Sequence, residues 1–148
     1  MAMTDQELKL ALDNEEPQYQ EIVAQLDESD VPRVRQFAES GDVALASKAV
    51  YLASLLKSEA AHEIVVRAAG SGNELVRVAS ATAIGNLPTS PRERAAGELI
   101  GDANPAMAKM VLRAVGPGSP AMKAKLQDLE RRTAVPELKA MLRDTLGN

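Results

Sequence analysis

Residues 73–87 read NELVRVASATAIGNL, and this stretch decides the fold because related stretches recur along the chain at a constant spacing. The related stretches begin at Asp42, Asn104 and Val135 and read DVALASKAVYLASLL, NPAMAKMVLRAVG and VPELKAMLRDTLG. Self-similarity at a fixed period, here a 31-residue period, is the signature of a repeat architecture. The chain is therefore expected to build one small structural unit four times.

Each of the four stretches has the pattern of a helix. The third, seventh and eleventh residues after each start are small or apolar, and this spacing places them on one helical face. Asp or Asn stands at three starts, where its side chain can cap the free N–H groups of the first turn. Pro105 and Pro136 follow two of the starts, at a position where a missing N–H costs nothing. The stripe consists of Leu45, Ala49, Ala53, Val76, Ser80, Ile84, Met107, Val111, Val115, Leu138, Leu142 and Leu146.

A further helix is expected before each of these four. Prolines fall at the predicted helix starts or just past the ends, and none lies in an interior, where it would break the helix. Glycine at 85, 116 and 147 is predicted to close the second helices with a left-handed residue. One helix pair is too small to bury its own stripe, so neighbouring pairs are expected to stack. The predicted first helices are 30–40, 58–69, 90–100 and 119–132.

The stretch 73–87 resembles the second helix of a HEAT repeat, and the short period is similar to that of the HEAT-like repeats of phycobilisome lyases. The resemblance implies an all-α fold, an α–α superhelix of about four helix pairs that spans residues 30–148 as one continuous domain. It also implies that the second helices line the concave face. The family's Arg is replaced at Ala46, Ala108 and Lys139, so a ladder of hydrogen bonds between repeats is expected to be incomplete. The matching residues are Asn73, Val76, Arg77, Ala79, Ala83, Ile84 and Gly85.

Residues 1–29 are predicted to form an N-terminal acidic helical cap. Two helices are expected there, over 4–13 and 17–27, and Thr4 with Glu7 forms a T-x-x-E capping box. End repeats need a polar outer face, which this acidic segment would supply. Whether these helices serve as a cap or as an interface stays open at the level of the sequence.

The sequence offers no set of residues for catalysis, a cofactor or a metal. His62 is the single histidine and there is no cysteine, so a histidine dyad and thiolate sites are excluded. No Gly-x-Ser-x-Gly nucleophile elbow and no EF-hand pattern occurs. Carboxylates at 15–16 and 27–30 are better used in capping and solvation. The chain is therefore predicted not to be an enzyme. The lack of cysteine favours a cytoplasmic location.

Charge is unevenly placed along the chain. Residues 1–42 carry 11 acidic and 3 basic side chains, whereas residues 43–148 carry 10 acidic and 14 basic ones. The basic C-terminal half makes nucleic-acid binding an alternative function. The net charge of −4 and the absence of Trp disfavour it, because stacking on bases needs aromatic rings. No apolar run is long enough to span a membrane, and the N-terminus lacks the pattern of a signal peptide.

The predicted function is protein binding on the concave face of the second helices. Apolar residues off the core stripe, with basic residues beside them, would suit an amphipathic helix or an acidic segment of a partner. The competing interpretation is that several of these residues pack against neighbouring helices. A tetrapyrrole lyase or chromophore chaperone is an alternative that the family resemblance alone implies, and the chain itself is expected to be a monomer or to self-associate weakly. The predicted contact residues are Val43, Ser47, Lys48, Tyr51, Leu75, Arg77, Val78, Thr82, Lys109 and Arg113.

Overall fold

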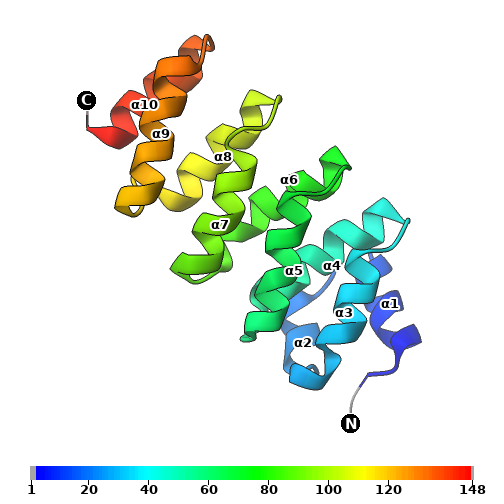
Figure 1. Cartoon of the computed structure of the whole chain (residues 1–148). Helices are drawn as coiled ribbons and strands as arrows, with labels where there is room; N and C mark the ends of the chain where they lie inside the picture. Colours follow the sequence, from blue (N-terminus) through cyan, green and yellow to red (C-terminus); the bar gives the residue numbers. More distant parts are fainter. Residues whose placement is uncertain (1–2, 148) are drawn as a thin grey trace.

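The computed structural model describes residues 3–147, and this part of the chain consists of helices joined by short turns, without a β-strand (Figure 1). The all-α prediction is therefore confirmed. Two short 3-10 turns, Glu28–Asp30 and Ile84–Asn86, accompany the α-helices. The α-helices are α1 (Asp5–Asp13), α2 (Tyr19–Ala24), α3 (Val31–Ala38), α4 (Val43–Leu55), α5 (Glu59–Ala69), α6 (Glu74–Ala83), α7 (Thr89–Leu99), α8 (Pro105–Val115), α9 (Pro120–Arg132) and α10 (Pro136–Leu146).

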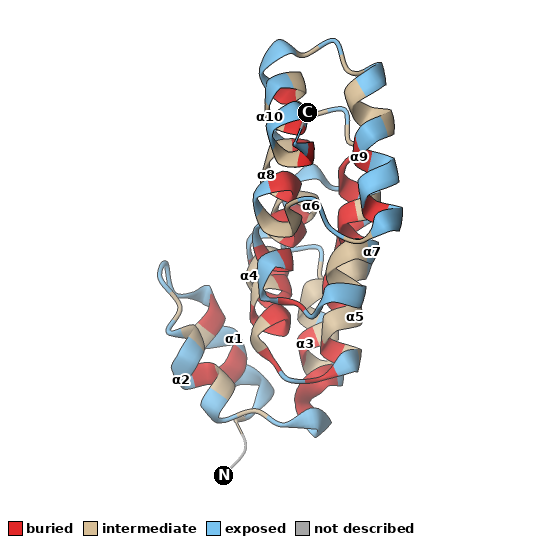
Figure 2. Cartoon of the chain, turned by 90° about the vertical axis from the view of Figure 1, so that its left-hand side faces the viewer, coloured by how far each residue is buried: buried red, intermediate tan, exposed pale blue. Residues whose placement is uncertain are grey.

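The helices from α3 onward pair in order along the chain and form two layers. Figure 1 shows the pairs following one another from the N-terminal end to the C-terminal end. In Figure 2 the first helices, α3, α5, α7 and α9, form one column and the second helices, α4, α6, α8 and α10, form the other. The buried residues lie mainly where the two columns face each other. One hydrophobic cluster runs through this interface and reaches into α1 and α2.

The second helices begin at the positions that the 31-residue spacing predicts. The side chain of Asp42 accepts a hydrogen bond from the N–H of Leu45, that of Asn73 from Leu75 and Val76, and that of Asn104 from Ala106. Val135, at the fourth start, makes no such bond. Each side-chain cap contributes roughly 1 kcal/mol to helix stability. Three of the four starts are thus fixed locally, and the last depends on Pro136 and on packing.

A second repeated hydrogen bond lies two residues before each start. In every copy the side-chain oxygen there accepts from the backbone N–H of the start residue, over 3.0, 3.1, 2.9 and 3.2 Å in chain order. This bond fixes the turn between first and second helix in the same way four times. We did not predict this bond from the sequence, although hydroxyl or carboxyl side chains recur there at a 31-residue spacing. The four acceptors are Ser40, Ser71, Asp102 and Thr133.

The predicted core stripe is buried at eleven of its twelve positions, and Val115 is half-buried. Ser80, the polar member, is fully buried and donates its hydroxyl to the carbonyl oxygen of Val65 on α5 over 2.9 Å. That bond satisfies the hydroxyl inside an aliphatic core, where an unpaired one would be costly. The stripe therefore joins each second helix to the first helix of its own pair.

Several predicted boundaries need correction. Helix α7 begins at Thr89, before the predicted start, because Pro91 lies in the first turn, where no N–H is required. Helix α2 has six residues and is shorter than predicted. Gly85 lies inside a 3-10 turn without a positive φ, whereas Gly116 (φ 58°) and Gly147 (φ 77°) do adopt positive φ. Only Gly147 lies in the left-handed helical region expected of a terminating glycine.

The N-terminal segment packs on α4. Thr4 and Glu7 form the predicted capping box at the start of α1, and the capped helix buries Leu8 and Leu12 completely. Figure 2 shows α1 and α2 beside the column of second helices, on the side away from α3. Arg33 on α3 anchors the start of α1 through the carbonyl oxygen of Met3 and a 3.0 Å ion pair with Asp5.

Candidate protein-binding face

Six of the predicted contact residues form two rows across three successive second helices. One row lies five positions after each helix start and the other nine, so both point away from the core stripe. All six are exposed or half-buried. The first row is Ser47, Val78 and Lys109, and the second is Tyr51, Thr82 and Arg113. We call these two rows, together with Lys48 and Leu75, the outer face.

The α4 part of the outer face is covered by the chain's own N-terminal segment. The rings of Tyr19 and Tyr51 meet edge to face with centroids 4.8 Å apart. Lys48 donates from Nζ to the carbonyl oxygen of Asn14 over 2.9 Å. Burial raises the pKa of Tyr19, which is consistent with a ring held against the protein. Two predicted contact residues, Lys48 and Tyr51, are therefore already engaged within the molecule.

The α6 part of the outer face is the most open and the most apolar. Leu75 is 63% exposed, one of two large hydrophobic side chains in the described residues with such exposure. Val78 lies one turn further and is half-buried, packed against the core. Thr82 is exposed and donates its hydroxyl to the carbonyl oxygen of Val78 over 3.0 Å, so its methyl group is left for contact. These three side chains form an i, i+3, i+7 row along one face of α6.

The α8 part of the outer face is basic. Lys109 is largely covered and its Nζ lies 2.8 Å from a carboxylate oxygen of Glu137 on α10. Its hydrogen bond and positive charge lower the pKa of the Glu137 carboxyl. Arg113 lies one turn further along α8 and is exposed. Arg113 thus provides an exposed guanidinium beside the apolar row of α6.

Two predicted contact residues lie elsewhere. Arg77 sits between the second and third helix pairs. Its Nε donates to Asp102 over 2.7 Å and its Nη1 donates to the carbonyl oxygen of Ser71 over 2.9 Å. The carboxyl of Asp102 has a lowered pKa, first because the N–H of Asn104 donates to it and then because Arg77 does, against the opposing effect of burial. Arg77 therefore acts as a clamp between pairs rather than as part of the outer face.

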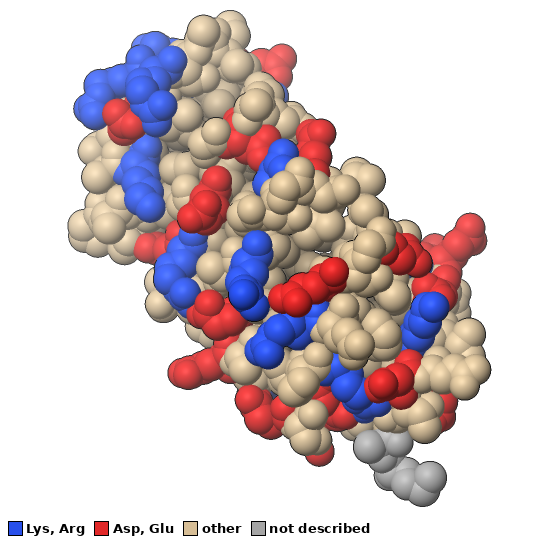
Figure 3. All heavy atoms as spheres, turned by 45° about the vertical axis from the view of Figure 1, so that its right-hand side comes forward, with Lys and Arg blue, Asp and Glu red and all other residues tan. Residues whose placement is uncertain are grey.

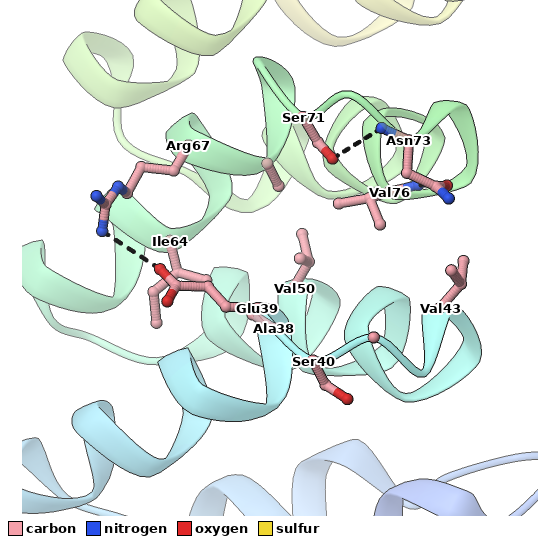
Figure 4. Close-up of a pocket in the computed structure, with 12 residues that line it drawn as sticks. Ala38, Glu39, Ser40, Val43, Val50, Ile64, Arg67, Ser71, Asn73 and Val76 are labelled. Carbon is pink, nitrogen blue, oxygen red and sulfur yellow. Dashed lines mark hydrogen bonds and ion pairs between the residues drawn. The ribbon is translucent and has the colours of Figure 1, made fainter.

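Val43 lines a groove between the first and second helix pairs (Figure 4). The groove has a volume of about 500 Å³, and its walls come from the turn before α4, from α5 and from the start of α6. Val43 and Val50 point from α4 toward Val76 on α6. At one end Arg67 forms a 3.4 Å ion pair with Glu39. The groove is an alternative place for an apolar side chain of a partner.

Within residues 3–147 no group of three or more His, Asp or Glu side chains is placed to hold a metal ion. Every buried side-chain nitrogen or oxygen in that range has a hydrogen-bond partner. His62, the single histidine, is half-buried, and its Nε2 lies 2.7 Å from the carbonyl oxygen of Leu56. The imidazole of His62 is therefore held in a contact with the backbone of the α4–α5 turn.

The two ends of the molecule differ in charge. Figure 3 shows Lys and Arg side chains gathered at the end that carries α9 and α10, and mixed charges over the rest of that face. On the first helices, charged pairs join consecutive repeats: Arg94 on α7 pairs with Glu63 on α5. Exposed pairs of this kind contribute less than about 1 kcal/mol each to stability. Their main effect is therefore on how consecutive first helices are aligned.

No model of a known protein family matches this chain, and a comparison with curated proteins finds no match either. No helix among residues 3–147 is long and apolar enough to cross a membrane.

Proposed function

We propose that the chain is a HEAT-like α-solenoid that works as a non-catalytic protein-binding module in the cytoplasm. Four helix pairs with a common 31-residue spacing support the solenoid, as does the turn hydrogen bond that recurs before every second helix. The Arg77–Asp102 pair corresponds to one rung of the incomplete ladder that the family resemblance implies. In such a solenoid the outer face of the second helices is the concave side.

The partner is proposed to lie across α6 and α8. The main support for this proposal is Leu75, whose side chain is 63% exposed. Covering this side chain with another protein would remove apolar surface from water, which favours binding. Val78 and Thr82 extend the apolar row beside it. Arg113 adds an exposed positive charge at the edge. An amphipathic helix whose apolar face meets α6 and whose acidic residue meets Arg113 would satisfy all four side chains.

The N-terminal segment covers the α4 part of the outer face and therefore limits where a partner can bind. Tyr51 and Lys48 bind the N-terminal segment, and Leu8 and Leu12 of that segment belong to the core. Releasing the segment would expose two fully buried leucines, at a cost of roughly 2 kcal/mol or more each. The partner site is therefore proposed on α6 and α8 alone, with the N-terminal segment as its boundary.

The test is capture of a partner from cells that naturally contain the protein. A photo-crosslinking residue at position 75 is expected to capture one discrete partner, whereas the same residue at exposed Glu98 on α7 is expected not to. In a pull-down of that partner with a tagged chain that carries no crosslinker, Leu75→Asp should reduce capture at least tenfold. The matched control is Leu10→Asp, since Leu10 has 64% exposure on α1. Equal capture by wild type and Leu75→Asp, with unchanged melting curves, would place the binding surface elsewhere.

A further inference from the structure

The side of α1 that faces away from α4 is an uncovered surface with an apolar centre. Leu8 and Leu12 point toward the core and are fully buried, whereas Leu10 points the other way and is 64% exposed. Glu7 and Asp13, three residues before and after, are exposed on the same side of the helix. Figure 1 places α1 at the edge of the array, beyond α3 and α4.

The surroundings of this leucine are acidic. Lys9 is the only basic residue between residues 3 and 28. Eight carboxylates in the same span are exposed, so the N-terminal end has a strong negative potential. The exposed carboxylates are Asp5, Glu7, Asp13, Glu15, Glu16, Glu21, Asp27 and Glu28.

The opposite end of the array is closed by basic side chains. The position eight residues after each start is buried Val50, Ala81 and Leu112 in the first three second helices, because each is covered by the next pair. In α10 this position is Arg143, which is exposed and whose Nε lies 3.3 Å from a carboxylate oxygen of Glu130 on α9. Arg131 and Arg132 are exposed at the end of α9, both within reach of Asp128. Charge replaces aliphatic side chains where the array stops, so apolar stacking of a further pair is disfavoured there.

We propose that copies of this chain associate head to tail, the outer side of α1 in one copy resting on the α9–α10 end of the next. Arginine suits such a contact, because its aliphatic stem can cover Leu10 while its guanidinium reaches the surrounding carboxylates. The two ends are different surfaces on opposite ends of one molecule, so the contact is heterologous and can extend from copy to copy. The occupant is a second copy because the complementary charges, acidic at one end and basic at the other, lie on the same chain.

The association is electrostatic and therefore depends on salt. Raising the salt from about 0.01 M to about 1 M shortens the screening length from about 30 Å to about 3 Å. Sedimentation of the full chain at increasing concentration should give an average mass that rises above 15.7 kDa at the low salt concentration and returns to that value at the high one. A mass of one chain at every concentration and salt would overturn the proposal.

Variants with reversed charges at one end or the other test whether the two ends contact each other. The double variant Arg131→Glu/Arg132→Glu and the double variant Asp13→Lys/Glu16→Lys should each sediment as monomers. Mixed together they should associate again, because each supplies the end that the other has lost. Leu10→Lys, which sets a positive charge against the arginines, should weaken association about tenfold while capture of the outer-face partner stays unchanged, which separates this proposal from the proposed function. Association that persists in both double variants, or a mixture that stays monomeric, would contradict it.

Discussion

The junction between the first and second helix pairs and the junction between the second and third differ at two equivalent places. Ala46 and Ser71 at the first junction correspond, one repeat later, to Arg77 and Asp102 at the second. At the second junction the arginine side chain spans the gap and binds both turns. At the first, an alanine cannot span it, and a groove of about 500 Å³ remains.

The third junction agrees with this comparison. The residue equivalent to Arg77 at that junction is Ala108. A smaller groove of about 180 Å³ lies beside it and is also lined by Leu138 on α10. The period of the repeat thus fixes where each junction lies. The side chain at this one position then determines whether an arginine joins the two turns or a groove remains between them.

Removing the clamp should have the largest effect. Arg77→Ala leaves Asp102, whose side chain is only 7% exposed, without its cation. Leaving a covered carboxylate unpaired costs a few kcal/mol, and partial exposure of Arg77 reduces this to about 2 kcal/mol. Urea unfolding should show this loss. Arg77→Ala combined with Asp102→Asn should cost less than the two single changes added together, and strict additivity would mean that the pair is not coupled.

Acid should weaken the second junction. The folded protein lowers the pKa of Asp102, so its contribution is complete above the carboxyl's ordinary pKa and is lost as the pH falls through the lowered value. The wild type is therefore expected to lose stability below about pH 4. In Asp102→Asn part of that loss is already present at neutral pH, so its further decrease on acidification should be smaller. A decrease as large as that of the wild type would exclude Asp102 as a contributor.

Transferring the clamp to the first junction should have a moderate effect. Ala46→Arg with Ser71→Asp copies the second junction into the first, where Ser71 lines the groove and Ala46 is buried. The free energy of unfolding should change by no more than about 1 kcal/mol in either direction, since the new pair must offset its own desolvation. A crystal structure of the variant should show the groove filled. A clearly larger loss of stability would indicate that the backbone at the two junctions differs.

The smallest effect is expected at the mouth of the groove. Arg67 and Glu39 form a 3.4 Å ion pair between side chains that are 69% and 61% exposed. Arg67→Ala should cost less than about 0.5 kcal/mol, because water screens exposed pairs. A double-mutant cycle with Glu39→Gln measures the coupling. A coupling above about 1 kcal/mol, the upper end for exposed pairs, would mean that this pair holds the junction together.

The sequence by itself determined the helices and their order. Asp42, Asn73 and Asn104 mark three helix starts because capping is a local interaction between a side chain and the next turn. The stripe from Leu45 to Leu146 predicted which face is buried, since the helical period fixes which side chains share a face. Both kinds of information lie within a few residues and need no knowledge of distant parts of the chain.

Only the tertiary structure decided how the predicted contact residues are used. Tyr51 meets Tyr19 across 32 positions of sequence, and Arg77 meets Asp102 across 25. A helical pattern tells which side chains leave the core, yet it does not tell which distant segment covers them. That depends on how α1 and α2 fold back onto α4 and on how successive pairs approach each other, because both arise from packing between segments far apart in the chain.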